Sequence, residues 1–496
     1  MTQLTDLPVE VIRRIVKQDF DNAILDGSQR IGRFPHRLAM NRLLHHISAD
    51  IYCQCAVITI SRPDNPTRLI RFWSNMNYIC QTARTRSVRS LFMILRNDPN
   101  LSEIYTVLTH TKLFAHGLPM AKSLIIDYRG TENSAQHPPQ FYDALSSMLS
   151  DALPNICNLW FLGWSVGMHF ELLLRTFLTK TAKPLETVII DMHYINCFDL
   201  SLGLQGDQPG IINSNLDHLQ LPRLPANELQ ALTIHSITTH LFWHRFYALP
   251  NAQVLEFSAL RSLSLRFSSS LMTMPRLSAR YQQIKFPCLT KLSLECSGFS
   301  ATEFLEIFPR HQIQVLEVRG NWDQLDVSPF VNLKRLAIGD IPNNHPRWFN
   351  SSLCTAQVRL VCLEIYSLQS YDLPRLLKLP ALAELNRLGI VCTTASTLIP
   401  GFLFPDALYS DGYTPLHRGI KYVSVHGPVH SSDINRRCIQ QLVCLFAGLP
   451  KLQFLSLSIV FKQYQEHIRF EIKAMAQSLS LAKHVQHLHD ISLQFQ

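Results

Sequence analysis

The residues that could perform chemistry in this chain are scattered and form no recognised catalytic or metal-binding motif. His240 and His244 would share one face of a helix, and His426 and His430 flank a Gly-Pro turn. Neither pair has a nearby cysteine or carboxylate cluster of the kind that completes a zinc site. The sequence also lacks the GxxxxGK[ST], GxGxxG, HExxH and GxSxG motifs. We therefore expect a protein that is not an enzyme and needs no metal or other cofactor.

Cysteine spacing predicts reduced thiols. Of the 12 cysteines, only Cys53 and Cys55 lie close together, and no CxxC pair occurs, so neither a metal framework nor a dense disulfide pattern is indicated. The N-terminus lacks the pattern of a signal peptide. The apolar stretch 442–461 is interrupted by Gly448, Pro450 and Lys451, which argues against a membrane span. We expect an intracellular protein, cytoplasmic or nuclear, that does not cross a membrane.

Composition and charge indicate a folded chain with a basic N-terminal segment. Hydrophobic residues make up 47% and charged residues 17% of the 496 positions, which is too apolar for a disordered chain. Residues 1–96 hold 14 basic and 7 acidic residues, so most of the net charge of +9 lies there. Such a segment favours an acidic partner, either a protein or a nucleic acid. The simpler alternative is that these charges cover ordinary solvated helix faces.

A recurring apolar phrase, Leu-x-x-Leu-x-Leu, predicts the elements that would position any binding residues. One copy is Leu289, Leu292 and Leu294. Thirteen copies follow one another after residue 120, at intervals of 20 to 44 residues, and self-similarity at a period of roughly 20–30 residues marks a stacked-repeat architecture. The middle anchors of the copies are Leu124, Leu159, Val188, Leu232, Leu263, Leu292, Leu316, Leu336, Leu363, Leu388, Val423, Leu455 and Ile491.

The phrase predicts one short parallel strand in each repeat. Alternate residues of a strand face opposite ways, so the two leucines of Leu-x-Leu point inward and the residues beside them point outward. The segments between strands include amphipathic helices such as 140–153 and 436–446. Long intervals imply loop insertions, for example at 199–217 and 400–414, where Gly, Pro, Asn and Asp are frequent.

This pattern resembles the leucine-rich-repeat superfamily in an irregular form, over about three quarters of the chain. The asparagine that usually follows the strand phrase is mostly missing. The resemblance implies an α/β leucine-rich-repeat solenoid, with a curved parallel sheet and helices on its convex side. It also implies that outward strand residues on the concave face bind the partner. Those positions are Arg266, Lys291, Ser293, Glu295, Glu317, Arg319, Arg335, Glu364, Tyr366 and Arg387.

The N-terminal residues 4–16 predict a short amphipathic helix. Pro8 suits the first helical position, and Leu4, Leu7, Val11, Ile12 and Ile15 form one apolar face. This stretch resembles the opening of an F-box, a helical module that docks onto the adaptor Skp1 in cullin-RING ubiquitin ligases. Carried onto this chain, the Skp1-docking residues are Leu7, Pro8, Val11, Ile12 and Ile15. The later Val-Cys-x-x-Trp-like signature of that family has no tryptophan in the equivalent zone 38–55. The alternative is a plain helix that caps the solenoid.

The segment that links the two regions is expected to be helical. Leu69, Ile70, Trp73, Met76 and Ile79 lie at helical spacing. We therefore divide the chain into an F-box-like all-α module at 1–55, a helical bridge at 56–117, and the repeat solenoid at 118–496.

The outward positions of the early repeats are apolar instead of charged. They are Ile125, Trp160, Leu162 and Ile189. We expect the bridge or an insertion to cover them, and if nothing covers them they are candidates for a binding hot spot.

Two functions follow from these patterns. The first is a non-catalytic substrate adaptor of an SCF-type ubiquitin ligase, in which the N-terminal helix docks Skp1 and the repeats bind a protein target. The second is an interaction scaffold without a ligase link, which could touch nucleic acid through Arg84, Arg86 and Arg89. The mixture of charges on the outward strand positions favours a protein partner, because a phosphate backbone would call for mostly Lys and Arg.

Overall fold

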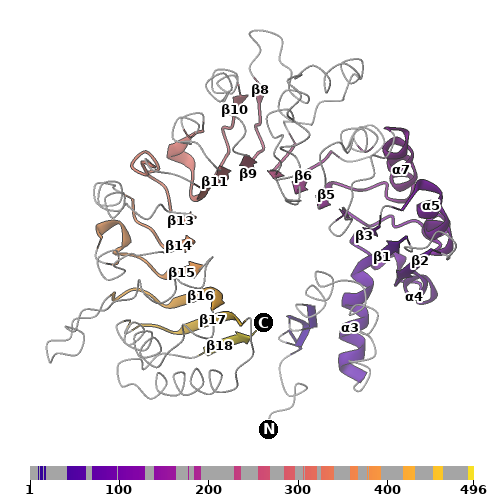
Figure 1. Cartoon of the computed structure of the whole chain (residues 1–496), viewed down its shortest axis with the longest axis horizontal. Helices are drawn as coiled ribbons and strands as arrows, with labels where there is room; N and C mark the ends of the chain where they lie inside the picture. The colour runs from indigo at the N-terminus through magenta and orange to yellow at the C-terminus, as the bar shows by residue number, and fades with distance from the viewer. Residues whose placement is uncertain are drawn as a thin grey trace. The chain divides into compact units, whose positions relative to one another are not determined.

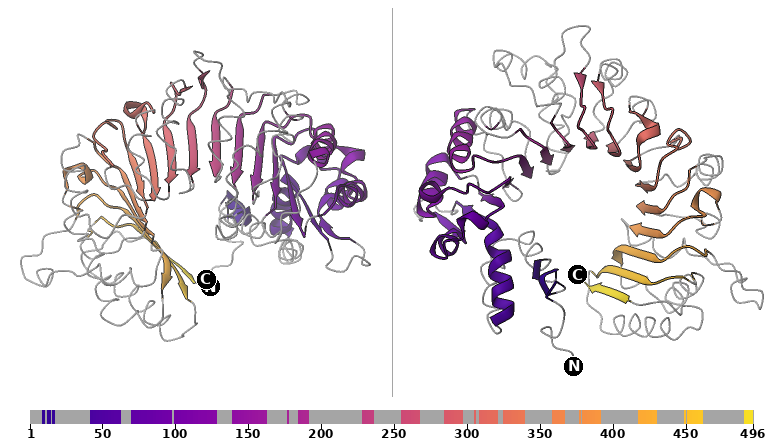
Figure 2. Two further views of the ribbon diagram at one scale, coloured as in Figure 1. Left: turned by 45° about the horizontal axis from the view of Figure 1, so that its top comes forward. Right: turned by 180° about the vertical axis from the view of Figure 1, so that it is seen from behind.

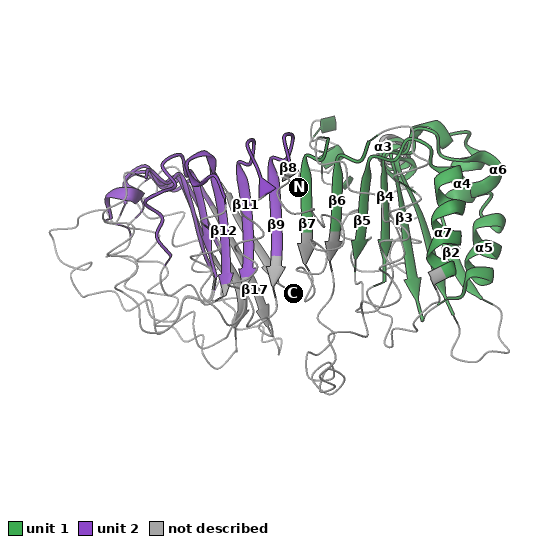
Figure 3. Cartoon of the chain, turned by 90° about the horizontal axis from the view of Figure 1, so that it is seen from above, with its two compact units in different colours: residues 1–250 green, residues 251–496 purple. Residues whose placement is uncertain are grey.

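The chain forms two compact units, Met1–Pro250 and Asn251–Gln496, which Figure 3 shows in different colours. The computed structural model describes residues 9–10, 12–14, 16–17, 42–62, 70–97, 99–128, 139–162, 177, 184–191, 228–235, 255–267, 284–296, 305, 308–320, 325–339, 358–366, 377, 379–391, 417–429, 449, 451–461 and 490–495. The boundary between the units lies inside the predicted repeat region and coincides with neither residue 55 nor residue 117.

The first unit is an α/β structure with a mostly parallel sheet (Figure 1). Its strands lie in the order β7-β6-β5-β4-β3-β1-β2, and only β1 and β2 pair antiparallel. Its elements are α3 (Arg42–Gln54), β1 (Cys55–Ser61), β2 (Arg71–Ser74), α4 (Met76–Gln81), η2 (Thr85–Ser87), β3 (Ser90–Arg96), α5 (Leu101–His110), α6 (Leu113–His116), β4 (Ser123–Asp127), α7 (Pro139–Ala152), β5 (Asn158–Leu162), β6 (Thr187–Asp191) and β7 (Ala231–His235).

The second unit has a parallel sheet in the order β9-β11-β12-β13-β14-β15-β16-β17-β18 (Figure 2). A separate parallel pair, β8 and β10, lies outside that sheet. The elements are β8 (Leu255–Glu256), β9 (Ser262–Phe267), β10 (Ile284–Lys285), β11 (Lys291–Cys296), η3 (Arg310–Gln312), β12 (Val315–Gly320), β13 (Arg335–Ile338), β14 (Cys362–Tyr366), η5 (Pro380–Leu382), β15 (Arg387–Val391), β16 (Tyr422–Val429), β17 (Phe454–Phe461) and β18 (Asp490–Phe495).

The predicted register of the apolar phrase is confirmed. Each of its thirteen middle anchors lies in a strand of one of the two sheets. Leu263, Leu292, Leu316 and Leu336 are paired in one register row across β9, β11, β12 and β13, and all four are fully buried. Burial of one such side chain contributes about 1.5–3 kcal/mol, so the leucine row is a continuous source of stability through the unit.

One backbone contact repeats between neighbouring strands. The carbonyl of Arg261 accepts hydrogen bonds from the amides of Thr290 and Lys291, and the carbonyl of Thr290 accepts from Gln314 and Val315 in the same way. In the first unit too, one carbonyl accepts hydrogen bonds from two consecutive amides of the next strand, in a series that begins at the carbonyl of Arg89 and ends at the amides of Gln230 and Ala231. Each strand therefore enters the sheet at a fixed place relative to its neighbour, which holds the leucine anchors in register.

The turns before β9, β11 and β13 are each built on a buried phenylalanine. The amides of Leu260, Leu289 and Leu333 donate to the carbonyls of Phe257, Phe286 and Phe330, three residues earlier. The rings of Phe257 and Phe286 are 5.4 Å apart between centroids, and Phe286 and Phe308 are also 5.4 Å apart. These aromatic residues form a second packed row beside the leucines.

The segment predicted as a helical bridge is only partly helical, and that prediction is corrected. Within 56–117, β1, β2 and β3 accompany α4, α5 and α6. Trp73, expected in a helix, lies in β2 and pairs with Thr59 of β1. The spacing from Met76 to Ile79 was helical, as α4 confirms, but a match over so few residues cannot distinguish a helix from an adjoining strand.

The burial patterns of β1 and β3 explain why they differ from the later strands. Both have five consecutive buried residues, whereas β5 alternates and exposes Trp160. A strand that is apolar at every position is covered on both faces. The N-terminal helix and α3 cover the face of β1 and β3 opposite Leu91 and Met93. The residues of this hydrophobic cluster are Ile12, Val16, Ile47, Ile51 and Tyr52 of the helices and Val57, Phe92 and Ile94 of the strands.

Within the described residues, no helix is long and apolar enough to cross a membrane.

Candidate functional site

The candidate site is the outer face of the sheet in the second unit, by which we mean the face opposite the buried leucines. The residues beside the inward leucines place Lys291, Ser293 and Glu295 of β11 on this face, together with Glu317 and Arg319 of β12. Arg335, Glu364 and Arg387 follow on β13, β14 and β15. All eight side chains are half-buried or exposed. Arg266 and Tyr366 occupy equivalent strand positions, but their side chains lie outside the described residues.

Four of these side chains form a row of alternating charge, which we call the charge row: Lys291, Glu317, Arg335 and Glu364. Lys291 Nζ lies 3.9 Å from Glu317 Oε1, and Arg335 Nη2 lies 3.9 Å from the same oxygen. Arg335 Nη2 also donates a 2.8 Å hydrogen bond to Glu364 Oε1. The charge row thus crosses β11, β12, β13 and β14 without a break.

The cations of the charge row are more accessible than its carboxylates. The side chains of Lys291 and Arg335 are 47% and 39% exposed, whereas those of Glu317 and Glu364 are 19% and 21% exposed. Burial by itself lowers the pKa of Arg335, but the hydrogen bond and charge of Glu364 outweigh it and raise that pKa overall. Each partly exposed pair contributes about 0.2–1 kcal/mol to stability. The charge row is therefore a weak stabiliser that presents fixed positive groups to a partner.

Two glycines let charged side chains lie flat on this face. A Cβ at Gly389 of β15 would stand 2.8 Å from Cγ of Glu364, and a Cβ at Gly339 would stand 3.0 Å from Cγ of Arg319. Real Cβ atoms essentially never approach to 2.8 Å, and 3.0 Å is tighter than nine in ten real contacts, so a larger residue at either position would require the neighbouring side chain to move. Glu364 reaches Arg335 while resting across the next strand because position 389 has no side chain.

Beyond the charge row, three residues form what we call the aromatic platform: Arg387, Tyr422 and Phe454. The guanidinium carbon of Arg387 lies 5.9 Å from the centre of the Tyr422 ring. The Tyr422 and Phe454 rings are stacked, with centroids 4.9 Å apart and planes at 1°. Both aromatic residues are 37% exposed, which is unusual for large apolar side chains packed so regularly.

Tyr422 and Phe454 were missed in the sequence, although a signal for them existed. Arg335, Cys362, Arg387, Tyr422 and Phe454 occupy one register row through β13 to β17. Each directly precedes the first inward residue of its strand. The sequence places three cations at that phrase position, Lys291, Arg335 and Arg387, on the outward face, and the same rule applied to later repeats points to the two aromatic residues.

Cys362, the one thiol described in this row, is shielded. It is buried and forms no disulfide. Burial raises its pKa, and the negative charge of Glu364 raises it further against the opposing effect of Arg335 and Arg387. The sulfur is therefore held as a neutral thiol, whereas reactive cysteines need the thiolate.

The predicted Skp1-docking residues are only partly visible. Ile12 is described and is fully buried in the cluster with α3 and the first strands. Leu7, Pro8, Val11 and Ile15 lie outside the described residues. On the same helix Val9 is 41% exposed, and Glu10, Arg13 and Arg14 are exposed. A partner would meet this second group, because Ile12 already packs against the chain itself.

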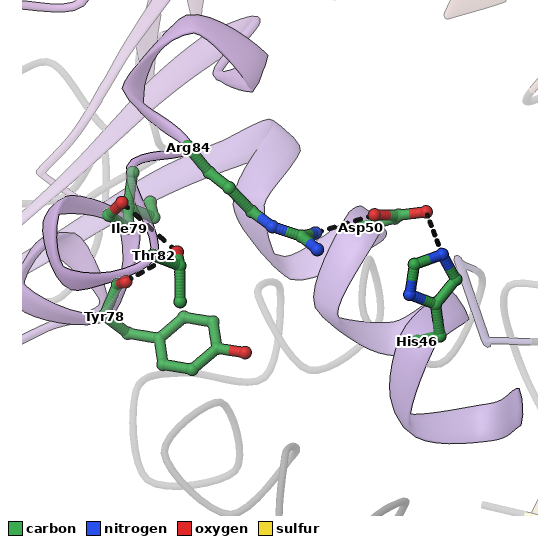
Figure 4. Close-up of polar contacts among 6 residues, drawn as sticks. All are labelled: His46, Asp50, Tyr78, Ile79, Thr82 and Arg84. Atoms are coloured by element: carbon green, nitrogen blue, oxygen red, sulfur yellow. Dashed lines mark hydrogen bonds and ion pairs between the residues drawn. The ribbon is translucent and has the colours of Figure 1, made fainter. Parts of the chain in front are cut away.

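The arginines proposed for nucleic-acid contact differ in their surroundings. Arg84 Nη1 donates a 2.6 Å hydrogen bond to Asp50 Oδ1, and His46 Nε2 lies 3.8 Å from the other oxygen of that carboxylate (Figure 4). Asp50 therefore neutralises Arg84 and ties it to α3. Arg86 and Arg89 are exposed. Of the three arginines, Arg84 is therefore the least available to a phosphate.

Among the described residues, the cover over the apolar outward residues of the early strands is uneven. Ile125 of β4 is half-buried and packs against the cluster of the N-terminal helix and α3. Leu162 and Ile189 are half-buried, but Trp160 of β5 is 37% exposed. The expected cover therefore extends over β1, β3 and part of β4.

No protein-family model matches this chain, and no curated protein resembles it. Among the described residues, no group of three or more His, Cys, Asp or Glu side chains is arranged to hold a metal ion.

Proposed function

We propose that this chain is a non-catalytic protein-recognition subunit, built as an irregular leucine-rich-repeat solenoid, and that the outer face of β11–β17 is its binding surface. The observation that carries the proposal is the charge row followed by the aromatic platform. Tyr and Arg are enriched among the residues that dominate binding energy at protein interfaces. Here they stand half-exposed on strands that the buried leucines hold rigid.

A rigid surface of this kind is suited to binding because little order is lost on association. Glu317 and Glu364 hold Lys291 and Arg335 in place, and the stacked ring of Phe454 restricts Tyr422. Side chains that are already ordered avoid a cost of about 0.5–1.5 kcal/mol each when a partner binds. The mixture of charges also discriminates between partners, since a like charge placed opposite is strongly unfavourable.

The experiment is an affinity purification from cell extract with a variant of the charge row. Lys291→Ala combined with Glu317→Ala removes a neighbouring cation and anion without changing the net charge. The matched control is Lys285→Ala with Glu256→Ala, an exposed pair on β10 and β8 that lies outside this sheet. We expect some proteins to be retained by the wild type and by the control but lost from the charge-row variant. A protein list that the charge-row variant leaves unchanged would exclude this surface.

The narrower form of the proposal is a substrate adaptor of an SCF-type ubiquitin ligase. It is supported by the F-box-like sequence of residues 4–16 and by the order of a helical opening followed by repeats. Because Ile12 is buried, the docking surface in this form consists of the exposed side of the helix, which includes Val9 and Glu10.

Purified Skp1 tests the adaptor role directly. Val9→Asp should abolish retention of Skp1 while leaving the thermal unfolding temperature unchanged, because Val9 is exposed. Ile12→Asp is the comparison variant, and it should lower that temperature because it places a charge in a packed cluster. If wild-type protein does not retain Skp1, the adaptor role fails and the recognition surface of the second unit is unaffected.

A further inference from the structure

The aromatic platform has the composition of a site for a carboxylate next to an apolar side chain. Arg387 is exposed, and within the described part of the chain its guanidinium pairs with no carboxylate, unlike Arg335. Its described contact is the face of the Tyr422 ring. A guanidinium that lies over a ring keeps its hydrogen-bond donors available for a charge-assisted, bidentate bond to a carboxylate.

The apolar half of the site is the stacked pair. Tyr422 and Phe454 are each 37% exposed, and their parallel rings form a flat apolar step. Two positions after Arg387 and Tyr422, the next residues on the outer face are Gly389 of β15 and Ser424 of β16, which are paired in register. Neither residue has a long side chain that would lie over the rings. An aliphatic or aromatic side chain from a partner would bury the step.

The spacing of the strands sets the spacing of the ligand groups. Neighbouring strands lie about 4.8 Å apart, so the middle of the Tyr422–Phe454 step lies roughly 7 Å from Arg387 across the sheet. In an extended peptide, side chains two residues apart point the same way and are also about 7 Å apart. An extended segment that crosses the strands can therefore place a carboxylate on Arg387 and an apolar side chain on the step.

We propose that the aromatic platform binds an extended segment of a partner protein in which an acidic residue and an apolar residue are separated by one position. The inference rests on the proposed function and names the chemistry of the segment recognised. A protein segment of this kind brings one carboxylate, which Arg387 neutralises. Single-stranded nucleic acid brings a phosphate at every nucleotide, and Glu317 and Glu364 on the same face would repel the phosphates that do not reach Arg387. The aromatic step alone could stack a base, so nucleic acid enters the test as a competing ligand.

The test is an array of nine-residue peptides in a Gly-Ser background that carries every pair of residue types at two positions separated by one. The purified full chain should prefer Asp or Glu paired with Leu, Ile, Met or Phe, in either order. The signal should be at least about tenfold above that of the same peptides with Lys in place of the acid. Arg387→Met should remove the preference for the acid, and Phe454→Ser the preference for the apolar residue.

Two variants serve as matched controls. Arg418→Met removes another exposed arginine, and Val331→Ser removes another exposed apolar side chain, and neither should change the array. A uniform array, or a preference that Arg387→Met and Phe454→Ser leave intact, would overturn the inference. Tighter binding of a fluorescein-labelled 15-residue oligouridine than of the best peptide, lost in Phe454→Ser, would also overturn it.

The outcome is separable from that of the proposed function. If the array shows no preference but the captured proteins still depend on Lys291 and Glu317, the inference alone fails. If the captured proteins do not depend on the charge row, the proposed function fails with it.

Discussion

At the scale of single residues, Glu364 of the outer face interacts with residues of three strands. Its carboxylate accepts a hydrogen bond from Arg335, its stem lies across Gly389, and its charge helps to raise the pKa of the Cys362 thiol. These three contacts come from three neighbouring strands. Glu364 therefore couples residues that are far apart in the sequence.

The contact with Gly389 predicts a measurable coupling. Gly389→Ala should cost about 1 kcal/mol in the wild type, because the new Cβ would stand 2.8 Å from Glu364 Cγ. In a Glu364→Ala background that atom is gone, and the same substitution should be nearly neutral. Urea unfolding of the four proteins gives a coupling free energy of about 0.5–1.5 kcal/mol. Gly339→Ala, which meets Arg319 instead, is the control and should be closer to additive with Glu364→Ala.

The Cys362 thiol predicts a difference in reactivity. Because its pKa is raised, less thiolate is present at any given pH, and burial restricts access as well. Iodoacetamide at pH 8 should therefore alkylate the exposed Cys288 before Cys362 in the native protein, and mass spectrometry of the peptides measures both rates. Equal alkylation rates would mean that the neighbouring side chains of the outer face do not shield Cys362.

At the scale of elements, the first unit depends on how α3, β1 and the β2–α4 corner are joined. Asn75 is buried at that corner. Its Oδ1 accepts from the amide of Val57 at 2.7 Å, and its Nδ2 donates to the carbonyls of Tyr52 at 3.0 Å and Cys55 at 2.8 Å. One side chain thus fixes the end of α3 to the beginning of β1. Helix α3 in turn covers the face of β1 and β3 opposite Leu91 and Met93.

Removing that side chain should therefore be costly. Asn75→Ala removes all three hydrogen bonds of this buried side chain, and we expect a loss of about 2–4 kcal/mol in the free energy of unfolding. Asn155→Ala is the matched control, because Asn155 is half-buried and makes one described side-chain bond, to the carbonyl of Pro119. It should cost about 1 kcal/mol. Similar losses for both variants in urea unfolding would contradict the role assigned to Asn75.

At the scale of the whole molecule, each inner strand of β11 to β17 is paired with the strand on either side of it. The doubled backbone contact and the leucine row connect β11 to β12 and β12 to β13. Stability in such an array is approximately a sum of terms between nearest neighbours. The two compact units should accordingly respond separately to damage in one of them.

Leu316→Ala tests that expectation. Removing a fully buried leucine should cost about 2–5 kcal/mol. In hydrogen exchange followed by mass spectrometry, the loss of protection should be concentrated in β11, β12 and β13 and should spare β4 and β5. Val331→Ala, at an exposed position of the same unit, should change no segment. Deprotection spread evenly over both units would show that the chain unfolds as a single cooperative body.

The strands of the repeats could be predicted from the sequence because their signal is local. Leu263, Leu292 and Leu316 each lie within a phrase of six residues, and burial of alternating leucines is favourable whatever the partner strand is. The strands β1 and β3 were not predicted. Their apolar residues follow one another without alternation, and that pattern becomes a strand signal only when helices are known to cover both faces.

The amino-acid sequence by itself therefore determined the direction, the inward residues and the register of the repeat strands, and it placed Lys291, Glu317, Arg335, Glu364 and Arg387 on one face. Tertiary structure decided which of those residues touch. The partners Arg335 and Glu364 are separated by 29 positions, and the stack of Tyr422 on Phe454 joins strands that are separated by a long intervening segment. Such contacts depend on the register between strands and on the small residues Gly389 and Ser424 beside them, because electrostatic and ring contacts act over a few ångströms in space and not along the chain.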